Sequence, residues 1–200
     1  MPLGDLLNRR SPRLVTCPAC QQQVAEGSVF CGQCGVRLDE PEAQPLHIVD
    51  RATGLFNERF IRPLLEDELA RSHRYQRPLG LLLVEPDAQE GETRVPEVEE
   101  NRLKVIAAAV AGTIREVDTP GVLSRSPVQL MVVLPDTDMA GTAHAANRIL
   151  GVVNSALVDL GAKARIGIAA VHPGQRLRAG AAVESLIRAT RTGRPELLGR

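Results

Sequence analysis

A β-hairpin at residues 122–134 constrains the fold of this chain more than any other stretch. Residues 130–134 form an unbroken apolar run with β-branched side chains, which is typical of a strand buried on both faces and set inside a sheet. Ser126-Pro127 stands where the turn is expected. Because proline fixes φ at about −65° and removes a backbone donor, this turn lacks the positive-φ glycine of an ordinary tight hairpin. We therefore expect no close phosphate cradle there.

Helical and extended patterns alternate on both sides of this hairpin. The helical spacing of apolar residues occurs at residues 58–75, 103–117, 146–160 and 186–190, and the strand pattern at residues 79–85, 122–125, 130–134 and 164–171. Asn57 is a candidate N-cap for the first helix. Pro63 predicts that the regular helix starts near Arg62 or bends there.

The order of these elements predicts the fold class. Strand, helix, strand, strand, helix, strand is the order of the split βαβ motif in ferredoxin-like folds. With 44% hydrophobic residues the chain can fill one core of this kind. We expect an α+β sandwich in which the helices cover one face of the sheet.

Four cysteines indicate a metal site near the N-terminus. They form two C-x-x-C pairs, Cys17 with Cys20 and Cys31 with Cys34, and two such pairs complete the tetrahedral four-sulfur shell of a structural zinc. Two disulfides or a redox pair are the alternatives, which a reducing compartment disfavours. Four thiolates leave no open coordination position, so we expect one structural Zn²⁺ ion. The stretch resembles the short zinc-ribbon modules of bacterial proteins.

Composition divides the chain and limits its partners. We expect a flexible tail at residues 1–16, the zinc ribbon at 17–37, an acidic linker with prolines at 38–46 and the main domain at 47–200. The 24 basic and 24 acidic residues cancel, so no whole-chain charge attracts nucleic acid or a membrane. Neither a membrane-spanning apolar run nor a signal-peptide core is present. We therefore expect a cytoplasmic protein.

Residues 47–194 resemble the GGDEF domain, whose active members are diguanylate cyclases that condense two GTP molecules into cyclic di-GMP. The opening residues Asp50-x-x-Thr-Gly-Leu-x-Asn57 are similar to that family's D-x-L-T-G-L-x-N motif, and residues 77–87 to its first strand. Arg115-Glu-Val-Asp118 resembles its R-x-x-D, and Arg165-Ile-Gly-Ile-Ala169 its S-I-G-I-A strand. The resemblance implies a ferredoxin-like βαββαβ sandwich of the GGDEF type, here preceded by a small zinc ribbon.

The catalytic signature of that family is missing, so the domain resembles a degenerate member. Counted back from Pro135, G-G-D-E-F falls on Ser126-Pro127-Val128-Gln129-Leu130. In the family the glycines let the backbone approach the GTP phosphates, and the acid after them binds magnesium. A proline and a valine supply neither function, and two phosphate-facing lysines are also absent. We therefore predict that the domain is not an enzyme.

Four residues are expected to remain from the family's nucleotide and metal site. Glu85-Pro-Asp87 stands in place of the D-x-D sequence whose first aspartate helps to hold metal. Asn57 closes the opening motif, and Glu100 stands at the position of a guanine-binding aspartate.

These features favour a non-catalytic regulatory or scaffold protein whose zinc ribbon docks onto another protein. A homodimer is one candidate, because active relatives work as dimers. The first alternative is a cyclic di-GMP receptor, because the resemblance implies that Arg115 and Asp118 hold that nucleotide. Their spacing to the signature is two residues longer than usual, and both residues are also suited simply to closing a helix.

The second alternative is a nucleic-acid contact made by the zinc ribbon. Arg9, Arg10, Arg13 and Arg37 would bind the phosphates. The two cysteine pairs bring no basic side chain of their own and only Phe30 as an aromatic one, so stacking surfaces for bases are missing. We expect no nucleic-acid partner.

Overall fold

The structure, a computed structural model, describes residues 13–39, 48–87 and 95–199. The chain forms two compact units, residues 1–47 and 48–200. Most of the expected tail and linker, together with Arg9 and Arg10, lies outside the described residues. No described helix is both long and apolar enough to span a bilayer.

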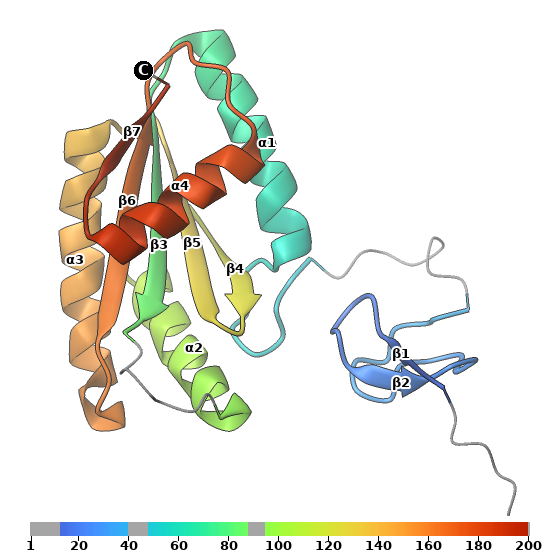
Figure 1. Ribbon diagram of the computed structural model, residues 1–200. Coiled ribbons are helices and arrows are strands. Elements are labelled where there is room, and N and C mark those ends of the chain that lie inside the picture. The colour runs from blue at the N-terminus through green and yellow to red at the C-terminus, as the bar shows by residue number, and fades with distance from the viewer. Residues whose placement is uncertain (1–12, 40–47, 88–94, 200) are drawn as a thin grey trace, which may run out of the picture. The chain divides into compact units, whose positions relative to one another are not determined.

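The smaller unit is built on two short antiparallel pairings (Figure 1). Strand β1 (Leu14–Thr16) pairs with β2 (Gln23–Ala25), and Phe30 forms an isolated bridge with Arg37. Each pairing encloses one C-x-x-C turn. The ribbon therefore begins at β1, inside the stretch that the sequence suggested as a flexible tail. A three-residue strand has too little pattern to be seen in the sequence.

The larger unit contains a five-stranded sheet in the order β4-β5-β3-β6-β7. Its strands are β3 (Leu79–Pro86), β4 (Thr119–Arg125), β5 (Val128–Pro135), β6 (Ala164–Val171) and β7 (Glu196–Leu198). The first four pair antiparallel with their neighbours, whereas β7 runs parallel to β6. The predicted hairpin is confirmed, with its Ser126–Pro127 peptide bond in the cis form. Strand β7 was not predicted.

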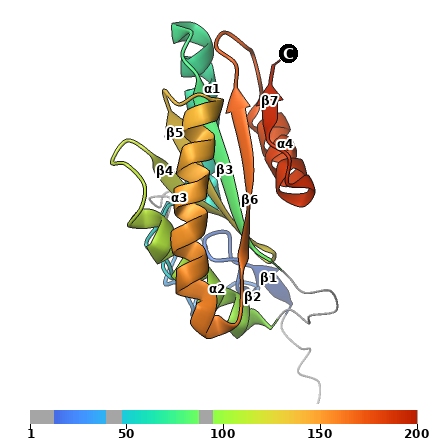
Figure 2. The same ribbon diagram turned by 90° about the vertical axis from the view of Figure 1, so that its left-hand side faces the viewer.

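Helices cover both faces of this sheet, so the prediction of a single covered face is wrong (Figures 1 and 2). The helices are α1 (Glu58–Tyr75), α2 (Pro96–Ala111), α3 (Met139–Leu157, followed by the 3₁₀ turn Val158–Leu160) and α4 (Ala179–Thr192). Helices α1 and α4 pack on Leu81 and Leu83, and α2 and α3 pack on Leu82 and Val84. Neighbouring residues of a strand point to opposite faces, so an unbroken apolar strand needs a cover on each.

Helix α1 has the expected bounds, whereas the bounds of the other three helices differ from the expected ones. Helix α1 runs from Glu58 to Tyr75 and contains Pro63, so of the two effects suggested for that proline the later start near Arg62 is wrong. Asn57 is at its N-cap position, but its side chain makes no capping hydrogen bond. Helix α2 ends at Ala111, well before residue 117, and α4 is 14 residues long where only its last part was predicted. The early end of α2 leaves residues 112–118 as a loop that carries Arg115 and Asp118.

Candidate functional site

The four cysteines of the smaller unit gather into one cluster. Their Sγ atoms all lie within 4.8 Å of one another, with Cys17 3.7 Å from Cys34 and Cys20 3.6 Å from Cys31. All four are free thiols, so the structure does not have the disulfides left open by the sequence. Zinc–sulfur bonds of about 2.3 Å at tetrahedral angles separate the sulfurs by about 3.8 Å. The cluster therefore fits one metal ion.

Backbone geometry prepares part of this cluster for metal. Backbone N–H groups of Cys34 and Gln33 lower the pKa of the Cys31 thiol to about 6. The thiolate is the form that binds metal, and Cys31 is the thiol of the cluster closest to that form, because burial raises the pKa of Cys20 and of Cys34. Cys17, Cys31 and Cys34 are buried with Val24 and Val36, and they form most of the small core of this unit.

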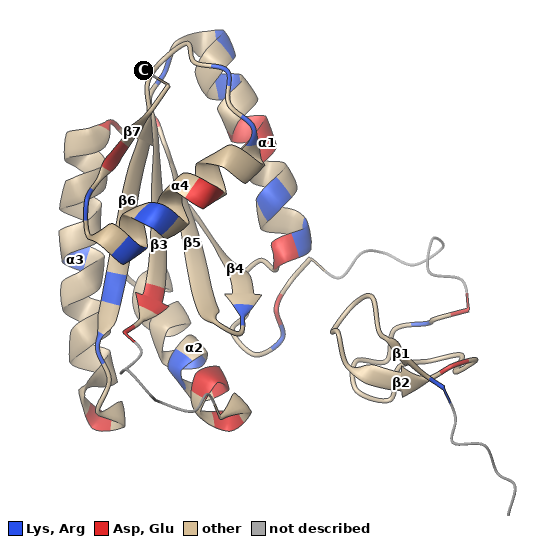
Figure 3. Cartoon of the chain, in the orientation of Figure 1, with Lys and Arg blue, Asp and Glu red and all other residues tan. Residues whose placement is uncertain are grey.

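Arg37, one of the basic residues near the cysteines, is held in an ion pair of the ribbon. The guanidinium of Arg37 donates to both carboxylate oxygens of Asp39, at 2.8 and 3.0 Å. In the larger unit, α1, α2 and α4 each carry both acidic and basic residues (Figure 3). Among the described residues, neither the ribbon nor these helices shows the basic stripe typical of nucleic-acid binding.

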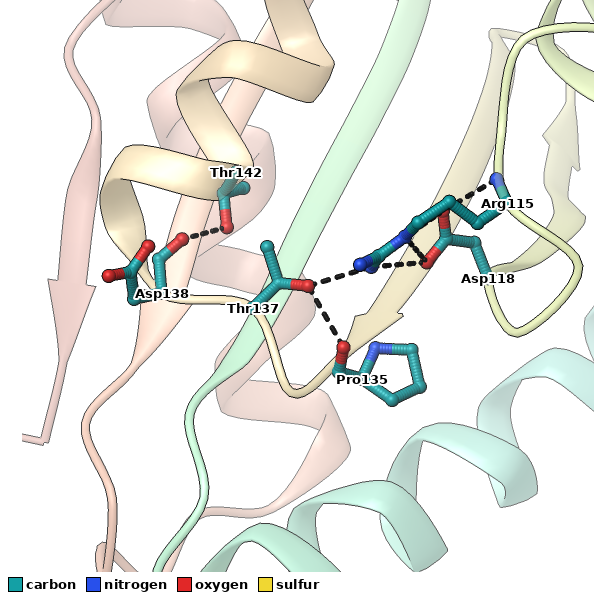
Figure 4. A network of polar contacts seen from close by, with 6 residues as sticks. All are labelled: Arg115, Asp118, Pro135, Thr137, Asp138 and Thr142. Carbon is teal, nitrogen blue, oxygen red and sulfur yellow. Dashed lines mark hydrogen bonds and ion pairs between the residues drawn. The ribbon is translucent and has the colours of Figure 1, made fainter.

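Arg115 and Asp118 meet in the loop between α2 and β4 (Figure 4). The Asp118 side chain is 2% exposed, and it accepts hydrogen bonds from the Arg115 backbone N–H at 2.9 Å and from Arg115 Nη2 at 2.7 Å. The Arg115 side chain remains 52% exposed. Because α2 has already ended, the two residues do not close a helix. They form a charge pair that holds one guanidinium in a fixed orientation at the surface.

Thr137 is a third member of this network, and sequence reasoning missed it. Arg115 Nη2 donates to Thr137 Oγ1 at 2.8 Å, and Thr137 Oγ1 donates to the Pro135 carbonyl at 2.9 Å. The neighbouring Asp138 caps α3 by accepting from the Gly141 N–H at 2.8 Å. Thr137 is therefore held between the end of β5 and the start of α3. It lies 22 residues from Arg115, and no motif connects the two in the sequence.

The opening motif ties its own loop to the hairpin. The buried carboxylate of Asp50 accepts from the backbone N–H groups of Ala52 and Thr53 and from the Thr53 hydroxyl. Its second oxygen binds Arg125, at the end of β4. The Val122 N–H also donates to the Phe56 carbonyl at 2.7 Å. This part of the motif therefore has a structural role that does not depend on a nucleotide.

Glu85 lies in a row of polar side chains across three strands. Its side chain, 9% exposed, accepts from Gln129 Nε2 at 2.7 Å on one oxygen and from Arg165 Nη2 at 3.3 Å on the other. Arg165 is the β6 partner of Glu85 in the strand register, and Gln129 is on β5 next to the Val84–Leu130 pair. Arg165 Nη1 also lies 3.8 Å from an oxygen of Asp87.

Val128, at the position of the family's magnesium-binding acid, packs away from this row. It is buried with Val84 and Leu130 on the α2 and α3 face, whereas strand alternation puts Glu85 on the face of Leu81 and Leu83. Magnesium prefers carboxylate and water oxygens in an octahedral shell. Because both Glu85 oxygens are bonded, the residues as paired here do not fit a magnesium site, and Val128 offers no oxygen of its own.

The structure does not bring all four expected remnants together. Glu85 and Asp87 share Arg165, but Glu100 pairs with Lys104 on α2 at 2.7 Å. This bond to Lys104 lowers the pKa of Glu100. Asn57 stands at the start of α1, where its carbonyl accepts from the N–H groups of Phe60 and Ile61. Arg165 was overlooked as a site residue, although it replaces the first serine of S-I-G-I-A.

Comparison with known proteins identifies the class of fold. No family model matches the chain, and no curated protein matches it in sequence. Solved structures of GGDEF domains do match it in three dimensions. The larger unit therefore has the fold of a GGDEF diguanylate cyclase domain, as predicted from the resemblance.

Three matches show how far the likeness extends. The diguanylate cyclase SiaD from Pseudomonas aeruginosa, solved with its activator SiaC, has a TM-score of 0.60 and 23% identity over 77% of this chain and 62% of SiaD. The GGDEF domain of DgcB from Caulobacter crescentus was solved with c-di-GMP. It has a TM-score of 0.55 and 13% identity, and the match covers 77% of this chain and 96% of the DgcB domain. LapD from Vibrio cholerae was also solved with c-di-GMP. It has a TM-score of 0.59 and 13% identity, and the match covers 76% of this chain and 37% of the LapD chain.

Proposed function

We propose that this protein is a non-catalytic regulatory protein of cyclic di-GMP signalling, built on a GGDEF fold that binds a partner. The observation that carries this proposal is the bonding of Glu85. Both oxygens of its carboxylate are bonded to Gln129 and Arg165 within the fold. The residue best placed to hold a catalytic cation is thus part of an internal ion pair.

The chemistry of diguanylate cyclases explains why this bonding matters. Phosphoryl transfer depends mainly on positioning and on cations that neutralise the developing charge. Here Glu85 is paired, Val128 is buried in the core and Pro127 occupies the turn. Each change removes a different contribution to the transition state. Together they favour a domain that keeps the fold and no longer forms cyclic di-GMP.

A product assay tests this proposal. Zinc-loaded protein incubated with GTP and magnesium should form no cyclic di-GMP, as judged by chromatography of the nucleotides. Formation of the product at a rate above the protein-free control would contradict it.

The smaller unit is proposed as the docking module, with one structural Zn²⁺ ion held by its four cysteines. Its described surface exposes large apolar side chains, including Leu14 at 63% and Phe30 at 59%. Large exposed apolar side chains on so small a module are candidates for a protein contact. SiaD, whose fold this chain shares, was solved with a protein activator, which supports a protein partner.

A second candidate function is binding of cyclic di-GMP by Arg115 and Asp118. The observation that favours it is the half-exposed guanidinium of Arg115, fixed by Asp118 and Thr137. Among the described residues, its Nη1 atom has no recorded hydrogen-bond acceptor, so that edge is available to a phosphate or a guanine. DgcB and LapD were solved with this nucleotide. A fixed guanidinium loses little side-chain freedom on binding an anion.

A further inference from the structure

We propose that the guanidinium of Arg165 takes the place of a divalent cation at the end of β3 and closes this site to metal. The buried carboxylate of Glu85 needs a positive partner, because an isolated buried charge is strongly unfavourable. Arg165 supplies this charge from the neighbouring strand, where it is the direct register partner of Glu85. Figure 3 shows the basic segment of β6 beside the acidic end of β3.

The geometry of Arg165 matches the bridging role of an ion. Nε and Nη2 lie 3.4 and 3.3 Å from Glu85 Oε2, and Nη1 lies 3.8 Å from Asp87 Oδ1. One guanidinium thus spans both acids of Glu85-Pro-Asp87. Asp87 is kept close to β6 because its N–H donates to the Lys163 carbonyl at 2.7 Å.

Gln129 completes the closure from the other side. Its amide nitrogen donates to Glu85 Oε1 at 2.7 Å, so an incoming cation would have to displace two different partners. Unlike a bound ion, a guanidinium carried by the chain is present at every magnesium concentration. The stability of the larger unit should therefore be independent of magnesium.

Thermal unfolding of the zinc-loaded full chain tests this inference. The melting temperature of the wild type should be the same in excess MgCl₂ and in KCl of equal ionic strength. Arg165→Ser leaves the Glu85 charge without its partner, so we expect its melting temperature in KCl to fall by about 3–6 °C. Magnesium should recover most of that loss, because the ion binds the folded state alone.

Three further variants define the control set. Arg188→Ser removes an arginine from another ion pair, with Glu196 at 2.6 Å, and should show no response to magnesium. Arg165→Ser/Glu85→Gln removes both charges and should also show none. Arg165→Gln keeps a longer polar side chain, and it should repeat the magnesium response if Arg165→Ser does not fold.

Two results would overturn the inference. One is a wild-type melting temperature that rises with magnesium as much as that of the Arg165 variants, and the other is an Arg165 variant that ignores magnesium. This inference relies on the proposed function only in treating this end of the sheet as non-catalytic. The unfolding experiment and the product assay measure different quantities, so the failure of one is distinguishable from the failure of the other.

Discussion

At the scale of single residues, Arg115 and Arg165 each reach a buried acid from the surface, as Arg125 does with Asp50. Arg115 holds the buried carboxylate of Asp118 and Arg165 that of Glu85, and each arginine stays about half exposed. In both pairs the acid is inside and the arginine reaches it from the surface, which leaves one face of the guanidinium in water. Arg165 also contacts Asp87, whereas the ion pair of Arg115 is with Asp118 alone among the described residues.

Arg115 is therefore the residue that we expect to bind cyclic di-GMP. Calorimetric titration of the zinc-loaded protein should give micromolar binding, and Arg115→Ala should lower the affinity at least tenfold, or about 1.4 kcal/mol. Arg188→Ala, which changes an arginine elsewhere on the surface, should bind like the wild type. Equal binding by the Arg115 variant would exclude this site, and no heat from any variant would leave protein binding as the role.

Single residues also show what the sequence could and could not reveal. The cysteine pairs and the Arg115–Asp118 pair were visible because their members are close along the chain. Arg165 and Thr137 were not, because they reach their partners through the strand register and through the packing of a helix start. The resemblance pointed to the serine that Arg165 replaces, and that departure was the available signal.

At the scale of elements, glycine sets the distance between α4 and the sheet. A Cβ atom on Gly167 in β6 would lie 2.1 Å from Thr190 Oγ1 and 2.6 Å from the Leu186 carbonyl oxygen. Both atoms belong to α4, and one is backbone, so a side chain at this position would push the helix away. This close approach explains why a helix rich in alanine and glycine can still form part of the core.

Substitution of Gly167 tests this packing. Gly167→Ala should lower the free energy of unfolding by about 1–3 kcal/mol through overpacking, measured by denaturant titration. Gly151→Ala on α3 is the matched control, because a Cβ atom there meets nothing within 4 Å. It should raise the free energy of unfolding by about 0.5–1 kcal/mol, since alanine is the better helix former. A neutral Gly167→Ala would show that α4 is not held at this distance.

Elements with a strong pattern were predicted well, and weak ones were missed. Strand β6 has the predicted bounds, because eight residues of β character lie between polar segments. The first turns of α4 read Ala-Gly-Ala-Ala, which has no apolar period, so only the later residues indicated a helix. Strand β7 has only three residues, and it pairs with β6 through its backbone. So short a strand has no side-chain pattern from which it could be predicted.

At the scale of the whole molecule, the chain combines two units with different sources of stability. The larger one has apolar clusters on both faces of its sheet, whereas the core of the smaller one consists mainly of its cysteines. The larger unit can therefore fold on hydrophobic burial, and we expect the smaller one to depend on a metal bound by its cysteines.

Removal of metal should unfold the smaller unit without affecting the stability of the larger one. A chelator should release one equivalent of zinc and make all four thiols reactive toward a thiol reagent. It should leave the melting temperature of the larger unit unchanged, as followed by circular dichroism. Fewer than four reactive thiols, or a fall of the main transition, would contradict this division of stability.

The central claim is that the GGDEF fold has been kept here without cyclase chemistry. The most direct measurement is the product assay, with zinc-loaded protein, GTP and either magnesium or manganese, and with an active diguanylate cyclase as the positive control. We expect the positive control to form cyclic di-GMP and this protein to leave GTP unchanged. Formation of cyclic di-GMP that is lost on Glu85→Ala would contradict the claim, because it would show that Glu85 still serves a catalytic cation.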